Sequence, residues 1–188
     1  MRTWLAGGLL AALTWTAHAE ERRELGAHEH GHAKLNVAID GSALALEIEA
    51  PGMDVLGFEH PAESEQDKAA VEAVKATLAD PLALFVPSAA AGCRVVEATV
   101  TLLQEEHEHE EEEAEAGADH HDEPLHSEFR GQYALECSDP GALAQLGFAW
   151  FDRFPNAQAV KVTMLDARGQ SSWEVERGDP PLAIGAGS

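Results

Sequence analysis

The sequence predicts an α+β fold with a ferredoxin-like β-α-β-β-α-β kernel, an extra strand at each end, and a disordered loop rich in His and acidic residues inserted in one hairpin. Three observations lead to this prediction: several segments alternate apolar and polar residues as strands do, two segments carry apolar residues at helical spacing, and an acidic run separates two strand-like segments. The alternative fold is a β-sandwich that carries two helices.

The chain first predicts a hairpin and then a helix. Residues 35–39 and 44–48 alternate apolar and polar side chains around Asp40-Gly41, which is a turn signal. Residues 64–79 follow Pro51-Gly52 and predict an amphipathic helix, because Ser64 is a favourable N-cap and the apolar residues recur at helical spacing. Those apolar residues are Val71, Val74 and Leu78.

The second half predicts two long strands, a second helix and a final hairpin. Residues 93–103 and 127–137 are rich in β-branched and aromatic side chains and predict paired strands. Residues 140–154 predict a helix, with Leu143, Leu146 and Trp150 on one face. Strands at 159–165 and 172–175 are then joined by the turn "DARG".

The ends of the chain predict export. Residues 1–19 resemble a secretory signal, with Arg2 ahead of a short apolar run and the small-x-small pattern Ala17-His18-Ala19 before a cleavage between Ala19 and Glu20. No apolar run approaches the ~20 residues that cross a bilayer, so we expect no stable membrane insertion. A single metal-binding domain is expected over residues 20–178, and the Gly- and Pro-rich residues 179–188 are expected to form a disordered tail.

Two cysteines, Cys93 and Cys137, lie at the start of one predicted strand and the end of the next. An even pair in an exported protein is most simply a disulfide. Two buried free thiols are the alternative. A disulfide here would close the base of the hairpin that carries the inserted loop.

The formal net charge is −22, and the segment 104–126 holds eleven acidic residues and no Lys or Arg. This charge disfavours nucleic acid and anionic lipid as partners and favours cations. A long insertion at a surface turn costs little closure entropy. We therefore expect the segment to be a flexible loop with a function.

Histidine is concentrated in two patches. His28, His30 and His32 precede the first strand, and a second patch occupies the inserted loop at His107, His109, His120, His121 and His126. Imidazole is the commonest protein ligand for borderline divalent metals, so both patches are candidate metal-binding segments. The donor types suit Zn²⁺, Cu²⁺ or Ni²⁺, and residue type alone does not select among them.

Two other histidine patterns carry less information. His60, in "GFEHP", is a single histidine before a proline and is more typical of a loop residue bonded to backbone than of a metal ligand. The segment "HEHGH" (28–32) formally matches the H-E-x-x-H zinc protease motif, but Gly26 and Gly31 disfavour the helix that this motif requires. We expect no enzymatic activity.

Several segments together resemble the ZrgA-type family of periplasmic zinc proteins. They are "HEHGHAKLNVAIDG", "PGMDVLGFEH", the His- and acid-rich loop, and "FDRFPNAQAVKVTMLDARGQ". The resemblance implies a periplasmic zinc-binding protein associated with an ABC-type zinc uptake system, with both histidine patches holding metal. It also strengthens the case for His60, because "GFEH" is part of the resemblance.

These observations lead to two functional hypotheses. In the first, a rigid α+β frame presents a chelating loop, captures Zn²⁺ and delivers it to a membrane zinc transporter. In the second, the acidic loop docks on a basic partner protein and metal binding is incidental.

Overall fold

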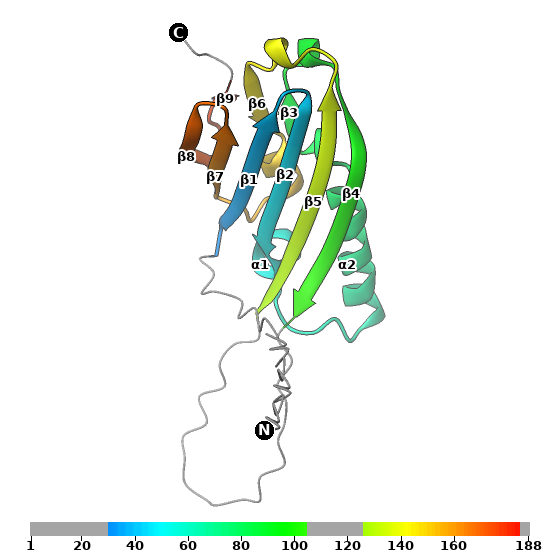
Figure 1. Cartoon of the computed structure of the whole chain (residues 1–188). Helices are drawn as coiled ribbons and strands as arrows, with labels where there is room; N and C mark the ends of the chain where they lie inside the picture. The colour runs from blue at the N-terminus through cyan, green and yellow to red at the C-terminus, as the bar shows by residue number, and fades with distance from the viewer. Residues whose placement is uncertain (1–29, 105–125, 185–188) are drawn as a thin grey trace, which may run out of the picture.

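The computed structural model describes residues 30–104 and 126–184, which form two sheets and three α-helices (Figure 1). The large sheet has six strands in the order β4-β5-β2-β1-β7-β8, and the small sheet has three in the order β3-β6-β9. The strands of the large sheet are β1 (His32–Asp40), β2 (Ala43–Pro51), β4 (Cys93–Gln104), β5 (Ser127–Cys137), β7 (Ala159–Asp166) and β8 (Gly169–Glu176).

The remaining elements lie behind the large sheet in the view of Figure 1. The helices are α1 (Gly52–Val55), α2 (Glu65–Leu78) and α3 (Trp150–Arg153), and the small sheet consists of β3 (Phe85–Pro87), β6 (Gln145–Phe148) and β9 (Leu182–Ala183). Three 3₁₀ turns complete the described elements: η1 (Pro81–Ala83) precedes β3, η2 (Ala89–Ala91) lies between β3 and β4, and η3 (Pro140–Ala142) lies between β5 and β6.

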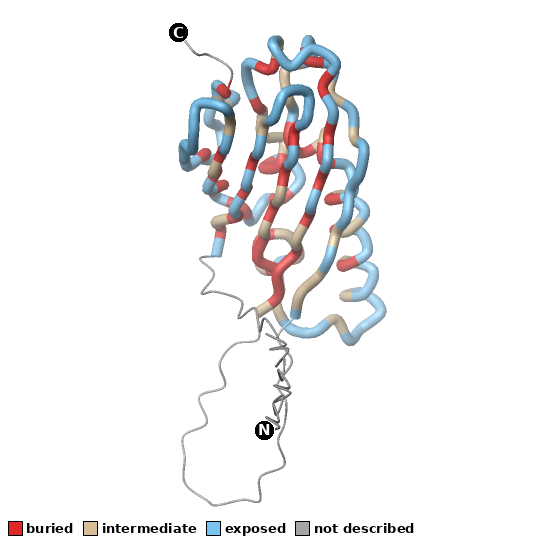
Figure 2. Tube along the Cα trace, in the orientation of Figure 1, coloured by how far each residue is buried: buried red, intermediate tan, exposed pale blue. Residues whose placement is uncertain are grey.

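One face of the large sheet is buried and the other faces solvent, which is visible as alternating colours along the strands in Figure 2. Along β5, for example, Phe129, Tyr133 and Leu135 are buried whereas Gln132 and Ala134 are exposed. The buried face joins a single core with α2 and the small sheet. The apolar alternation in the sequence therefore predicted correctly that these strands have one solvated face.

The predicted helix after the first hairpin is confirmed. α2 begins after Ser64, whose side chain accepts a hydrogen bond from the Asp67 N–H at 3.0 Å, as an N-cap residue does. Val71, Val74 and Leu78 are its buried residues. The predicted pairing of residues 93–103 with residues 127–137 is also confirmed, since β4 and β5 form an antiparallel ladder whose register shifts once, between Val95 and Glu97.

The disulfide between Cys93 and Cys137 is present. The two cysteines are register partners at one end of the β4–β5 ladder, and Gln104 pairs with Ser127 at the other end. The bridge thus closes the end of the hairpin opposite to the inserted segment.

The strand order differs from that of the expected ferredoxin-like kernel. There β2 and β7 would be neighbours, but β1 lies between them, antiparallel to β2 and parallel to β7. The tight turn at Asp40 and Gly41 keeps β1 beside β2, and β5 occupies the other edge of β2. Of the two strands that were expected to flank the kernel, β1 therefore lies inside the sheet and β8 lies at its edge.

The prediction of a helix over residues 140–154 was wrong. Residues 140–142 form η3, residues 145–148 form β6, and only Trp150–Arg153 is helical. Gly141 and Gly147 weaken a helix, and β6 pairs with β3, a partner far away in the sequence. Leu143, Leu146 and Trp150 are buried as the pattern required, but from a strand and short turns.

The chain beyond Gly178 also differs from expectation where it is described. Leu182 and Ala183 form β9 against β6, and Ile184 is buried in the core. Residues 185–188 lie outside the described residues, as do the proposed signal peptide with its Ala19–Glu20 junction and the inserted segment 105–125. In the described ranges, no helix is long and apolar enough to cross a membrane.

Replacing both Cys93 and Cys137 by Ser should lower the free energy of unfolding by about 4 kcal/mol, because the bridge closes a loop of 44 residues in the unfolded chain. Urea unfolding of the oxidised parent and the double variant measures this difference. A difference below about 1 kcal/mol would contradict a stabilising role for the bridge.

Candidate metal centre

Gly31 turns the chain between His30 and the start of β1. Its φ is +88°, a left-handed conformation that favours glycine, and a Cβ there would lie 2.9 Å from the Gln158 side chain. The Gly31 carbonyl accepts the N–H groups of Gln158 at 2.8 Å and Ala159 at 2.9 Å. The Gly31 N–H donates to Asp54 Oδ1 at 2.6 Å. The peptide groups on both sides of Gly31 are therefore fixed, which orients His30.

A second short segment brings Glu59 to the same place. After β2, α1 makes one turn and is followed by Gly57, which has a φ of +86° and donates its N–H to the Met53 carbonyl at 3.1 Å. The Asn156 side chain donates to the same carbonyl at 3.3 Å. The chain then reverses, and Glu59 points inward with a side chain that is 9% exposed.

His126 enters from the start of β5. Pro51, at the end of β2, is the register partner of Glu128, so the beginning of β5 lies beside the beginning of α1. A Cβ at Gly52 would overlap Ser127 Oγ, so glycine at this position permits the close approach. The residue before Ser127 is thereby placed next to Glu59.

These three segments bring two imidazoles and one carboxylate together. His30 Nε2 lies 3.2 Å from Glu59 Oε2, and His126 Nδ1 lies 3.7 Å from the same oxygen. One donor atom from each residue lies within 4.8 Å of the others. A tetrahedral Zn²⁺ with bonds of about 2.0–2.2 Å places its donors roughly 3.3 Å apart, so small side-chain movements would bring all three into contact with one ion.

The surroundings of the cluster favour a cation. Glu59 Oε1 is buried and has no hydrogen-bond partner among the described residues. The His30 side chain is 52% exposed and that of His126 is 28% exposed, so an ion can reach the carboxylate from solvent. A nearly buried carboxylate beneath two accessible imidazoles is suited to capture a divalent ion from solution.

Asp54 lies next to this cluster and is 1% exposed. Burial is the largest influence on its carboxyl group and raises its pKa, and the nearby Glu59 adds to the rise. The hydrogen bond from Gly31 and the charges of His30 and His32 act in the opposite direction. The pKa of Asp54 is raised overall, because the effect of burial exceeds that of the Gly31 hydrogen bond and the two histidines.

The other predicted ligands lie outside the three-residue cluster. His32 Nδ1 is 3.2 Å from Glu174 Oε1 on β8. His60 is exposed, stacks on Phe58 with ring centroids 4.5 Å apart, and donates from Nδ1 to the Pro61 carbonyl at 3.0 Å. The positions of His28, His107, His109, His120 and His121 lie outside the described residues.

Glu59 is the member of the cluster that sequence reasoning missed. It precedes His60 in "GFEH", where the sequence-based prediction named His60 and not Glu59. The available signal was that this glutamate lies in a short segment bounded by Gly57 and Pro61, two residue types that favour turns. Its neighbours His30 and His126 are distant in the sequence, so only the fold reveals the contact.

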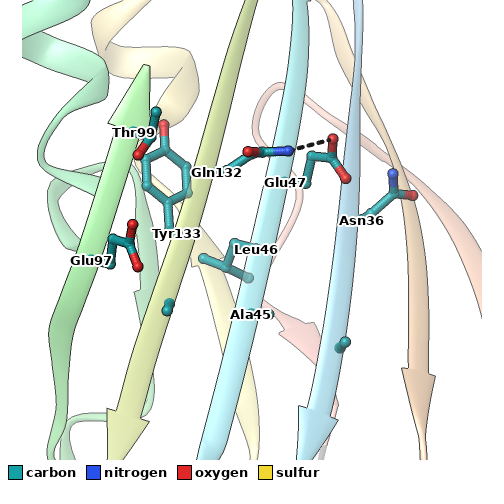
Figure 3. A pocket seen from close by; sticks show the side chains of 10 residues that line it. Asn36, Ala45, Leu46, Glu47, Glu97, Thr99, Gln132 and Tyr133 are labelled. Carbon is teal, nitrogen blue, oxygen red and sulfur yellow. Dashed lines mark hydrogen bonds between the residues drawn. The ribbon is translucent and has the colours of Figure 1, made fainter. Parts of the chain in front are cut away.

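A hollow on the solvent face of the large sheet is separate from this cluster (Figure 3). Ala38, Ala45 and Ala134 are successive register partners on β1, β2 and β5 and contribute small side chains to it. Asn36, Glu47 and Gln132 form a polar row beside them, and none of the histidines that the structure describes lines the hollow. The hollow therefore lacks the imidazole donors that distinguish the metal centre.

The comparison with protein families bears on what the cluster binds. The model of the family described as ZrgA family zinc uptake protein matches residues 27–184. The chain belongs to this family. The matched range contains all three residues of the cluster, and a family of zinc uptake proteins implies a zinc-related function for this chain. A comparison with curated proteins gave no match.

Gly31→Ala and Gly41→Ala form a matched pair, because both place an L side chain at positive φ, and nothing lies within 4 Å of a Cβ at Gly41. Each should lose about 1–2 kcal/mol of stability from backbone strain. Only Gly31→Ala should also weaken zinc binding, by about tenfold or more, because it displaces His30.

Urea unfolding and zinc titration against a competing chelator measure the two effects separately. Equal zinc affinity for both variants would show that the backbone at Gly31 does not orient a ligand.

Proposed function

We propose that this protein captures Zn²⁺ in the periplasm, holds it between His30, Glu59 and His126, and delivers it to a membrane zinc uptake transporter of the ABC type. The observation that carries the proposal is the convergence of two imidazoles on one nearly buried carboxylate. Membership in a family of zinc uptake proteins supports zinc as the cargo.

The donor set suits an ion that is bound and then released. Structural zinc sites generally use four protein ligands, whereas sites that exchange a ligand generally use three. Among the described residues the cluster offers three donors, and two of them are accessible side chains. A receiving protein can therefore approach the ion from the side of the imidazoles and replace them one at a time.

The histidines outside the cluster fit a collecting role in this proposal. His28 lies two residues before His30, and His107, His109, His120 and His121 precede His126 along the inserted segment. Weak binding by these histidines and the eleven carboxylates would raise the local concentration of cations close to the tighter site. His32 and His60 do not bind the same ion in this scheme, since their side chains contact Glu174 and Pro61.

Two observations support a location in the periplasm. The disulfide between Cys93 and Cys137 is of a kind that persists in oxidising compartments. The first 19 residues have the pattern of a secretory signal. The location and the transporter remain parts of the proposal.

Removing a ligand tests the site. Both His126→Ala and Glu59→Gln should weaken zinc binding by at least tenfold, since the first removes one of three donors and the second replaces the charged carboxylate by a neutral, weaker oxygen donor. His60→Ala is the matched control, because it removes an exposed histidine close to Glu59 in sequence and should leave the affinity unchanged within about twofold. Titration against a chromophoric chelator measures all three.

A further variant separates the frame from the inserted segment. It replaces residues 105–125 by a short Gly/Ser turn and keeps His126. We expect native mass spectrometry with limiting zinc to find one ion still bound. Loss of that ion, with the protein still folded, would place the main site in the inserted segment and contradict the proposal.

A further inference from the structure

Asp54 is a carboxylate in an unusual position. It lies in the single turn of α1, is 1% exposed, and accepts the Gly31 N–H at 2.6 Å through Oδ1. Its other oxygen, Oδ2, is buried and has no hydrogen-bond partner among the described residues. Burying a carboxylate is costly unless it is paired, so its place here requires an explanation beyond packing.

The residues around Asp54 belong to the metal centre or adjoin it. The charged side chains that act on it are His30, His32 and Glu59, and burial has the largest effect on its pKa. Among the described residues, the positively charged side chains that influence the pKa of Asp54 are thus histidines and not Lys or Arg. Asp54 therefore belongs to the surroundings of the cluster and not to one of the surface ion pairs.

The bond to Gly31 has a direct geometric consequence for His30. The amide that donates to Asp54 is the peptide group joining His30 to Gly31, so Asp54 holds the carbonyl side of His30 itself. The next peptide group is held by Gln158 and Ala159, at the start of β7. Without Asp54, the second attachment would be the one remaining backbone restraint at Gly31 among the described residues, and rotation about the Gly31 dihedrals would carry His30 away from Glu59.

We propose that Asp54 is a positioning residue of the zinc site, which fixes His30 opposite Glu59 by accepting the Gly31 N–H. This inference rests on the proposed function, since it assigns a role in zinc binding at the same cluster. Asp54 does not contact the ion in this account. Its effect on affinity is transmitted through the backbone of His30.

Two substitutions separate the hydrogen bond from the charge. Asp54→Asn keeps an oxygen that can accept the Gly31 N–H, whereas Asp54→Ala removes the acceptor. Zinc titration against a competing chelator should show at least a tenfold loss of affinity for Asp54→Ala and a change within about threefold for Asp54→Asn. Val71→Ala is the control for destabilisation alone, because Val71 is buried on α2, and it should leave zinc affinity unchanged.

A double-mutant cycle with His30→Ala tests the route of the effect. In the His30→Ala background, measured with a weaker chelator, Asp54→Ala should change the affinity by less than twofold, because the ligand that it positions is already missing. Affinity within threefold of the parent for Asp54→Ala would overturn the inference. Equal losses for Asp54→Asn and Asp54→Ala would do so as well, as would an undiminished loss in the His30→Ala background.

His126→Ala, titrated in the same series, distinguishes this inference from the function on which it rests. If His126→Ala binds zinc as tightly as the parent, the cluster is not the zinc site and both proposals fail. If His126→Ala loses zinc and Asp54→Ala does not, only the role of Asp54 is wrong.

Discussion

The register of β5 between β2 and β4 determines where the metal centre forms. Because successive side chains of a strand point to opposite faces, a slip of one residue would expose Phe129, Tyr133 and Leu135 to solvent. Burial of three such side chains is worth roughly 1.5–3 kcal/mol each, which strongly disfavours the slipped register. The correct register places Pro51 opposite Glu128 and so sets His126 beside the turn that leads to Glu59.

The metal centre contains features that do not stabilise the fold in themselves. Asp54 and Glu59 are carboxylates with little exposure, and each has a buried oxygen without a hydrogen-bond partner among the described residues. Gly31, which donates to Asp54, and Gly57, which lies between Asp54 and Glu59 in the chain, hold left-handed backbone conformations. The rest of the described domain offsets these costs through one continuous core and a disulfide. An incoming divalent cation would compensate the buried negative charge of Glu59, which connects that energetic cost to the proposed capture of zinc.

Local patterns in the sequence predicted the parts of the fold that depend on local interactions. The Asp40-Gly41 hairpin, the helix capped by Ser64, and the β4–β5 hairpin closed by Cys93 and Cys137 all follow from alternation, spacing or turn chemistry. Residues 140–154 could not be predicted in this way, because apolar spacing suited a helix whereas pairing of β6 with distant β3 decided the outcome. The insertion of β1 between β2 and β7 and the meeting of His30, Glu59 and His126 likewise depend on contacts between segments far apart in the chain. Histidine content therefore indicated metal binding, but it could not identify the carboxylate at the centre of the cluster.

The central claim is that one zinc ion binds where the N-terminal segment, the turn after α1 and the start of β5 meet. Anomalous diffraction at the zinc absorption edge, from crystals of the full chain given one equivalent of zinc, tests it most directly. We expect one dominant peak within bonding distance of His30 Nε2, a Glu59 carboxylate oxygen and a ring nitrogen of His126. A dominant peak elsewhere, with this cluster empty, would contradict it.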